Sequence, residues 1–286
     1  MCLIAFAVGM RPDLPLLLAA NRDEFFDRPT APWHRWNLPD GGEALCGRDL
    51  RDGGTWLGVS LAGRVAMLTN VRSPQAASGL RSRGELVTRW LAGEPLATLQ
   101  ADNEPKAYGG FNLVVGDLRS GAWHGLSNCD PLRPSDGVVP TLTSHSLAPG
   151  VYGLSNAALD TPWPKTLRLK AAMTGAVVTT TNASPLPGWE SSLARALADE
   201  TRAPTDQLPT TGVELALELG LSSPFVRLPE QGYGTRSSLV LRITATEQPT
   251  RWLLEAHEWT HTPLTPGQTH LWDNTRRRRE SALLGN

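Results

Sequence analysis

Cys2 is the residue whose type and position best suit covalent chemistry in this chain. It follows Met1 directly and opens an apolar run over residues 2–8. A small side chain at position 2 allows the initiator methionine to be trimmed, which would leave a thiol and a free α-amine on one residue. The α-amine titrates at a pKa of roughly 7.7–8.0, so a nucleophile and a weak base would be joined, as in N-terminal-nucleophile catalysis. The alternative is a small, inert cysteine.

Four polar residues beside predicted strands could complete an acyl-transfer site around this thiol. A carboxylate at Asp23 would orient the amine, and the amides of Asn70 and Asn156 could donate hydrogen bonds to an oxyanion. Arg236 near the thiol would favour the thiolate. Each has a structural alternative, because asparagine is common where strands end, Asp23 could pair with Arg22, and Arg236 could be a surface residue in a turn.

Five further residues are predicted to contact a substrate: Asn21, Arg22, Trp33, Trp56 and Arg72. The chain has 10 tryptophans, a high number, and while most are expected to pack in the core, some are expected to line a cleft. Trp33 opens the segment at 33–36, which follows the polar cluster at 21–24 and is interpreted as a cleft wall. A packed surface loop is the other interpretation of that segment.

The elements that must position these residues are predicted to be mainly hairpins. Apolar runs bounded by turn residues favour strands, and a Ser82–Glu85 spacing typical of a capping box favours a helix start. Early strands, mid-chain helices and late strands together predict an α/β (α+β) layered sandwich of antiparallel sheets, in one domain over residues 1–286. Strands are predicted at 2–8, 14–20, 56–60, 64–69, 111–115, 122–126, 151–155, 237–244 and 251–259, helices at 82–90, 163–173, 190–198 and 213–219, and loops at 28–39, 40–54 and 201–212.

Composition narrows the class of protein. The formal net charge is −1 and no global field favours nucleic acid. Three cysteines without paired spacing make a disulfide scaffold or a structural zinc site unexpected. The amino end has no basic segment before its apolar run, and no apolar stretch approaches about 18 residues. A cytoplasmic protein without stable membrane insertion is therefore expected.

Two further patterns in the sequence do not contribute to the predicted site. His257 and His261 are four residues apart, but they fall in a predicted strand and loop, where that spacing loses its helical meaning, so no metal site is predicted. A run of four arginines, at 276–279 near the carboxyl end, is interpreted as a solvated tail. Weak attraction to anionic lipid or to an acyl-CoA phosphate is the alternative.

Several motifs, in this order, resemble those of one family. They are Met1-Cys2-Leu3-Ile4, Asn21-Arg22-Asp23-Glu24 with Arg28-Pro29, Gly53-Gly54-Thr55-Trp56-Leu57-Gly58, Thr69-Asn70-Val71-Arg72, Gly109-Gly110-Phe111-Asn112-Leu113, Gly153-Leu154-Ser155-Asn156 with Leu159-Asp160-Thr161-Pro162-Trp163-Pro164-Lys165, and Gly234-Thr235-Arg236-Ser237-Ser238. The chain is similar over nearly its whole length to the NRDE family, also called the transport and Golgi organization 2 family, a distant relative of the cysteine-type N-terminal-nucleophile hydrolases.

This resemblance implies a fold and a set of roles. The fold would be the four-layer αββα sandwich, with two antiparallel sheets between helix layers. Cys2 would be the nucleophile, Asp23 would bind its amine and thiol, and Asn70 and Asn156 would position the oxyanion and substrate. Arg236 would match a late arginine near the active site.

One position departs from the related acylases, which carry an arginine three residues before the aspartate. Ala20 stands there in this chain, and the nearest arginine is Arg22. Residues 20 and 22 of a strand lie about 7 Å apart on the same face. Arg22 is therefore expected to replace the missing arginine only if the strand bends, and otherwise activation of the thiol is weaker.

Two functions follow from these observations, and a third is an alternative to both. The first is hydrolysis of a linear amide or another acyl bond of a small, amphipathic substrate through a Cys2 acyl-enzyme. The second is binding or trafficking of haem, acyl-CoA or a similar ligand in the same cleft, without catalysis. The third is a structural protein in which Cys2 merely packs. No cofactor is required, although haem could bind as a ligand.

Overall fold

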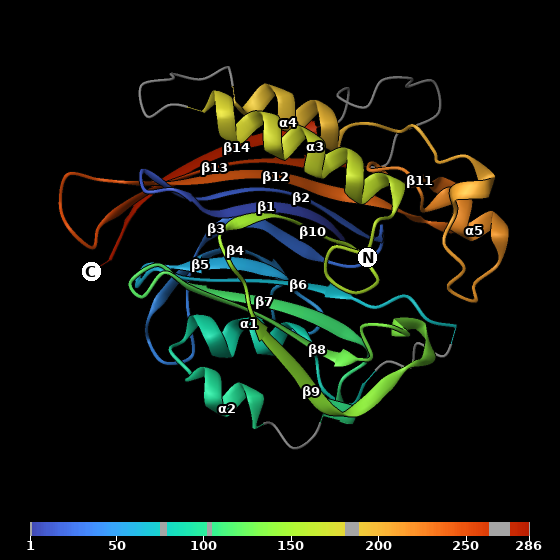
Figure 1. The fold of residues 1–286 in the computed structure, drawn as a ribbon, viewed down its shortest axis with the longest axis horizontal. Helices are drawn as coiled ribbons and strands as arrows, with labels where there is room; N and C mark the ends of the chain where they lie inside the picture. Colours follow the sequence, from blue (N-terminus) through green and yellow to red (C-terminus); the bar gives the residue numbers. More distant parts are fainter. Residues whose placement is uncertain (1, 75–78, 102–104, 181–188, 263–274, 286) are drawn as a thin grey trace.

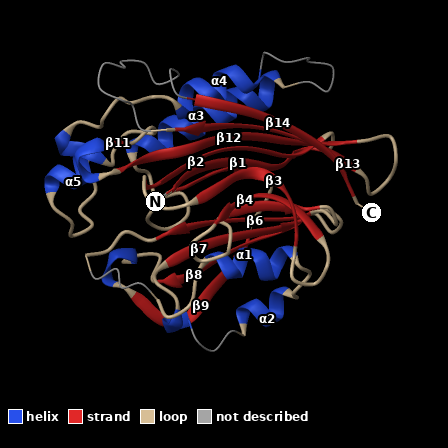
Figure 2. Ribbon diagram, turned by 180° about the vertical axis from the view of Figure 1, so that it is seen from behind, coloured by secondary structure: helices blue, strands red, loops and turns tan. Residues whose placement is uncertain are grey.

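Two stacked β-sheets with helices on both outer faces form the molecule, in the computed structural model (Figure 1). The structure describes all residues except 1, 75–78, 102–104, 181–188, 263–274 and 286. The four layers confirm the predicted αββα arrangement of two antiparallel sheets. Seen from behind, the strands fill the two central layers and the helices lie outside them (Figure 2).

The first sheet carries Cys2 and the polar cluster at 21–24. Its strands run in the order β10-β1-β2-β12-β13-β14, and β11 pairs with β12. All of these pairs are antiparallel. The strands are β1 (Cys2–Arg11), β2 (Leu14–Phe25), β10 (Gly150–Leu154), β11 (Arg227–Leu228), β12 (Tyr233–Ala245), β13 (Trp252–His261) and β14 (Thr275–Leu284).

The second sheet follows the chain order, so strands that are consecutive in the sequence are neighbours in the sheet. Its order is β3-β4-β5-β6-β7-β8-β9. The strands are β3 (Thr30–Asn37), β4 (Glu43–Asp49), β5 (Leu57–Ser60), β6 (Arg64–Asn70), β7 (Phe111–Asp117), β8 (Ala122–Cys129) and β9 (Val138–Ser146).

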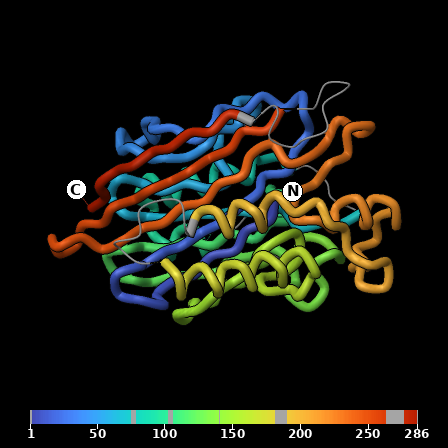
Figure 3. The backbone as a smooth tube through the Cα atoms, turned by 90° about the horizontal axis from the view of Figure 1, so that it is seen from above, coloured from blue at the N-terminus to red at the C-terminus, as the bar shows by residue number. Residues whose placement is uncertain are grey.

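Helices cover each sheet on the side away from its partner. In Figure 3, seen from above, α3 and α4 run along the outer face of the first sheet, while α1 packs on β5 and β6 of the second. None of the helices in the described part has the length and apolar character needed to span a membrane. The helices are α1 (Gly84–Leu91), α2 (Leu96–Gln100), α3 (Pro164–Thr179), α4 (Trp189–Leu197) and α5 (Leu215–Gly220), with short 3₁₀ turns at Pro105–Ala107, Pro134–Asp136, Thr205–Gln207 and Pro229–Gln231.

Alternation along β1 divides the core into two. Ile4 and Phe6 face the second sheet and join the large apolar cluster between the sheets. Leu3 and Ala5 face the other way and pack under α3 and α4. Because side chains alternate along a strand, Cys2 shares the inter-sheet face with Ile4.

The structure corrects several predicted elements. The segments at 28–39 and 40–54, predicted as loops, contain β3 and β4, and β2 continues through the polar cluster to Phe25. The sequence did not indicate these strands, because both are half-exposed at their ends and carry prolines or polar residues there. The capping box is also wrong, since Arg83 occupies the N-cap of α1 without a side-chain hydrogen bond.

The arginine run at 276–279 is not a solvated tail. It lies in β14, the outermost strand of the first sheet, paired with β13. All four arginines are exposed, but Arg277 forms an ion pair with Glu190 of α4 and lies over the ring of Trp259 at 5.3 Å. Ladder hydrogen bonds to β13 therefore hold the run in place.

Candidate active site

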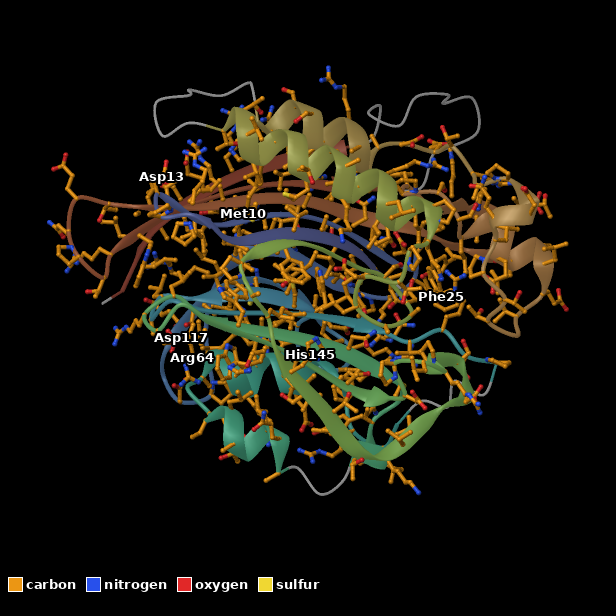
Figure 4. All side chains as sticks on the ribbon, viewed as in Figure 1. Met10, Asp13, Phe25, Arg64, Asp117 and His145 are labelled. Atoms are coloured by element: carbon orange, nitrogen blue, oxygen red, sulfur yellow. The ribbon has the colours of Figure 1, made fainter. Side chains whose placement is uncertain are left out.

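Cys2 lies at the wall of a cavity of about 670 Å³. Its side chain is 8% exposed, so the thiol is nearly covered but borders the cavity. Figure 4 places Phe25 at the same end of the sandwich as the start of the chain, opposite Asp13 at the far end of the β1–β2 hairpin. Arg22, Asp23, Trp56 and Asn70 line the same cavity, so five of the ten predicted site residues meet there.

Arg22 stands beside Cys2 because of strand register. The two residues are direct partners across β1 and β2, and partner side chains of a strand pair share one face. Ala20 faces Ile4 instead, so the predicted bend of β2 is not needed to bring an arginine to the thiol.

The guanidinium of Arg22 is held by several groups. It lies 4.4 Å from the centroid of the Trp56 ring and donates to Thr30 Oγ1 (3.2 Å) and to Asp49 Oδ2 (3.3 Å). Gly47 makes room for this stack, because a Cβ there would lie 2.4 Å from the Trp56 ring. Trp56 therefore stacks on Arg22 and orients it, and does not form an uncovered wall of the cavity.

Asp23 is buried at 1% exposure, next to a bulge in the neighbouring strand. The hydroxyl of Thr235 donates to its Oδ1 at 2.7 Å, and the same hydroxyl oxygen accepts from the Val226 N–H. Burial raises the pKa of Asp23, while the positive charge of Lys165 and the Thr235 hydrogen bond lower it. The carboxylate is thus positioned as an acceptor at the cavity wall.

Asn70 and Asn156 act as a pair with different tasks. The Asn156 amide donates both to the Asn70 carbonyl (2.9 Å) and to Asn70 Oδ1 (3.1 Å). Asn156 is fully buried and its side-chain N–H groups are used in these two bonds, whereas Asn70 lines the cavity. Asn70 is therefore the asparagine at the cavity wall, and Asn156 holds it in place.

Lys165 is a residue that sequence reasoning missed at this site. It lies in the first turn of α3, is 2% exposed, and its Nζ has no hydrogen-bond partner among the described residues. Burial, followed by the charge of Arg72, lowers its pKa to about 8, and the charges of Asp23 and Cys2 oppose that effect. Its position in the family motif at 159–165 was the signal that could have identified it. The polar residues around it in the predicted helix suggested a surface lysine instead.

Arg72 lies behind the cavity rather than on its wall. Its guanidinium forms a buried ion pair with Glu218 and lies 4.8 Å from the Trp163 ring. Its backbone N–H donates to the Asn156 carbonyl at 2.8 Å. Arg72 therefore supports Asn156 and adds positive charge near Asp23, but it does not touch the cavity.

Three predicted residues lie apart from the cavity. The Asn21 amide points to the helix side and donates to the carbonyls of Leu197 and Pro224. Trp33 is 2% exposed in the inter-sheet core, so the interpretation of this residue as a cleft wall is wrong. Arg236 donates to backbone carbonyls of residues 25, 26 and 28, so it stabilises the turn after β2.

The three thiols are all buried, and burial raises the pKa of each. Burial raises the pKa of Cys2, and the charges of Asp23 and Glu24 raise it further while Arg22 lowers it. Burial also raises the pKa of Cys46 to about 12 and that of Cys129 to about 11. Neither of these two borders the cavity that contains Cys2.

His257 and His261 both lie in β13, so they are about 13 Å apart along the strand. His257 contacts Glu190 at 3.0 Å, and His261 contacts the Ser238 hydroxyl at 2.9 Å. These partners explain both side chains as structural contacts to neighbouring elements.

Comparison with known proteins identifies sequence relatives over most of the chain. The family described as Transport and Golgi organisation 2 matches residues 1–255. A Transport and Golgi organization protein 2 homolog from Bos taurus is 35% identical over 91% of this chain and 99% of that protein. The Homo sapiens homolog is 35% identical over 86% and 89%, and the Drosophila melanogaster protein 28% over 85% and 88%.

Solved structures give more distant matches. One is a mutant of a conjugated bile acid hydrolase from Clostridium perfringens, with 9% identity, 98% of this chain and 96% of that chain covered, and a TM-score of 0.49. Another is an N-acylethanolamine-hydrolyzing acid amidase ortholog from Caenorhabditis elegans, with 10% identity, 84% and 92% covered, and a TM-score of 0.43.

Proposed function

The chain belongs to the Transport and Golgi organisation 2 family, and from the arrangement around Cys2 we propose that it hydrolyses a linear amide or another acyl bond. In this proposal Cys2 is the nucleophile of an N-terminal-nucleophile hydrolase and the small, amphipathic substrate occupies the neighbouring cavity. The observation that carries the proposal is the meeting of Cys2, Asp23 and Asn70 at one cavity wall. Nucleophile, acceptor and oxyanion donor are the parts that acyl transfer needs.

The proposed reaction starts after removal of Met1, which lies outside the described residues. The α-amine of Cys2 takes the thiol proton while Sγ attacks the substrate carbonyl. Asn70 donates an N–H to the resulting oxyanion, and Asp23 accepts from the amine to orient it. The amine then passes its proton to the leaving group as the C–N or other acyl bond breaks. A water molecule attacks the acyl-enzyme, releases the acid and restores the thiol.

Intact-mass analysis before and after brief treatment with a limiting thiol-reactive acylating probe tests this proposal. We expect loss of Met1 and acylation of Cys2 ahead of Cys46 and Cys129, because those two thiols lie outside the cavity. Peptide mapping identifies the labelled cysteine. The Cys2→Ala protein should lose this label.

The Cys46→Ala protein provides the matched control, since it removes another buried thiol and should keep the Cys2 label. Retention of Met1 in the purified protein would contradict the proposal. So would equal turnover of an amide panel by the native protein and by Cys2→Ser and Cys2→Ala.

One observation favours a second function, the binding of haem, acyl-CoA or another amphipathic ligand without catalysis. Burial raises the pKa of the Cys2 thiol, which disfavours the reactive thiolate. A cavity of about 670 Å³ falls within the usual range for small-molecule sites. Titration of the Cys2→Ala protein with haem and with an acyl-CoA tests this alternative, since binding at micromolar protein is expected only if the cavity serves as a carrier site.

A further inference from the structure

The carboxylates that line the Cys2 cavity in the described part of the chain are all accompanied by a donor. Asp23 accepts from Thr235, and Glu24 lies 3.8 Å from Arg22. Arg28 serves the remaining two, with Nε 2.6 Å from Asp49 and Nη2 2.5 Å from Asp52. The negative charges of the wall are therefore already matched by the protein itself.

The positive charge of Arg83 is not matched in this way. The residue lines the same cavity as Cys2 and is half-buried, yet it forms no ion pair with any carboxylate of the described residues. Its Nη1 donates to the Gly110 carbonyl at 3.2 Å, which leaves guanidinium donors for a ligand. Arg51, by contrast, is exposed at the cavity rim, where solvent can satisfy it.

The backbone holds Arg83 in a fixed place. Arg83 is the N-cap of α1, and the next residue, Gly84, packs directly on Gly54 and Thr55. A Cβ on Gly54 would lie 2.7 Å from the Gly84 carbonyl carbon, and one on Gly84 would lie 3.0 Å from the Thr55 nitrogen. Two glycines therefore let the start of α1 pack against the second sheet, and this packing fixes the backbone position of Arg83.

The charge of Arg83 also acts near the thiol. Burial lowers the pKa of Arg83, and the Cys2 thiolate, when it forms, opposes this effect most, followed by Glu24. The residue is thus within electrostatic reach of the proposed nucleophile.

We propose that Arg83 is an anion-binding residue of the cavity, and that the acyl compound bound beside Cys2 carries a carboxylate or a phosphate group. The guanidinium fork suits both groups, because each offers two oxygens to parallel N–H donors. An unmatched, partly buried positive charge favours an anionic over a neutral ligand of equal size. This inference takes the acyl substrate from the proposed function and adds its charged group.

Binding to the Cys2→Ser protein tests the proposal without turnover. The probes are N-hexanoylglycine against its carboxamide, and N-hexanoyl-2-aminoethyl phosphate against the corresponding alcohol, each measured by calorimetry. We expect at least one anion to bind about tenfold more tightly than its neutral match, as one charge-assisted hydrogen-bonded pair provides. The pair with the larger advantage distinguishes carboxylate from phosphate as the source.

Two further substitutions make the result specific to Arg83. Arg83→Gln should abolish the advantage of the anion, Arg83→Lys should keep part of it, and Arg51→Gln should leave it unchanged. Equal affinity for anion and neutral match, an advantage that survives Arg83→Gln, or no binding of any probe would each overturn the proposal.

Alkylation of Cys2 gives an independent measurement. Iodoacetate and iodoacetamide transfer a similar group to Sγ with loss of iodide, and they differ by one negative charge. The ratio of the iodoacetate rate to the iodoacetamide rate should fall about tenfold in Arg83→Gln but not in Arg51→Gln. If neither reagent modifies Cys2, the proposed hydrolase function fails, while the calorimetric result still decides the role of Arg83.

Discussion

Each group at the candidate site depends on a second residue for its position. Asn156 commits both amide protons to Asn70, Thr235 holds Asp23, and Trp56 stacks on Arg22. A group held in this way reaches its reactive geometry without reordering, which is the basis of preorganised catalysis. The supporting residues should therefore influence reactivity without touching the substrate.

Lys165 is the clearest case of a residue that should serve function at a cost in stability. Its folded pKa of about 8 lies below the ordinary value of 10.5, so burial of the ammonium destabilises the folded protein at pH 7. We expect Lys165→Met to raise the free energy of unfolding by about 2–3 kcal/mol at pH 7. The gain should shrink as the pH rises from about 8 to 10.5, where the native lysine becomes neutral. Urea unfolding across this pH range measures it.

The same substitution should slow alkylation of Cys2 about tenfold at pH 7. Without the Lys165 charge the pKa of buried Asp23 rises further, and a protonated Asp23 no longer accepts from the α-amine. Lys170→Met is the matched control, because Lys170 lies in the same helix but pairs with Asp160 near the surface. A Lys165→Met protein that is more stable and equally reactive would assign Lys165 no role at the site.

At the scale of elements, α3 reaches the sheet through a glycine of β10. A Cβ at Gly153 would lie 2.4 Å from Thr166 Cγ2 and 2.8 Å from Lys170 Cδ. Gly153→Ala should therefore push α3 from β10 and lower the free energy of unfolding by about 1–3 kcal/mol, as overpacking generally does. The midpoint of urea unfolding measures this loss.

Gly175 supplies the contrast within α3 itself. It is exposed and a Cβ there would meet nothing within 4 Å, so Gly175→Ala should stabilise by about 0.5–1 kcal/mol through helix propensity. If both alanines changed stability by the same amount, the close approach at Gly153 would not limit the packing of α3.

The hairpins of this chain are predictable from its sequence, because apolar alternation and turn residues are local signals. β5 with β6 and β7 with β8 fall close to their expected places. β14 was missed because its arginines hide any apolar alternation, and β3 and β4 were missed because a proline and charged residues interrupt theirs. β14 pairs with β13 along ten partners although it contains four consecutive arginines.

The residues of the candidate site also divide into those that the sequence predicts and those that it does not. Cys2, Asp23 and Asn70 were predicted because their types suit the chemistry and a family pattern links them. Lys165 and Arg83 were not, since a residue in or next to a helix gives no local sign of which distant residues its side chain will approach. The contact of the Asn156 amide with Asn70 could not be predicted, because only hydrogen-bond geometry shows it.

At the scale of the whole molecule, Glu258 links the two sheets. Its Oε2 accepts from the backbone N–H of Trp33 at 2.7 Å, which joins β13 to β3. Burial raises the pKa of Glu258 from 4.5 to about 7, so the folded protein favours the protonated form. The stability contributed by this group is therefore complete below pH 4.5 and is lost as the pH rises through about 7.

Glu258→Gln should remove that loss. The amide oxygen can still accept from Trp33, but it carries no charge to bury. We expect the variant to match the native protein near pH 4 and to be more stable by up to about 3 kcal/mol at pH 8. Glu247→Gln, at an exposed turn, should follow the native curve, and a constant difference across pH would contradict the assignment.

The arginine run of β14 has a consequence for how copies of the molecule meet. An outermost strand exposes hydrogen-bonding groups that another sheet can extend, which is a common route to aggregation. β14 lies at such an edge of the first sheet and carries exposed arginines at 276–279. If two copies paired in parallel and in register along this edge, their arginine rows would lie side by side and repel. The positive charge of the run therefore disfavours this way of extending the sheet.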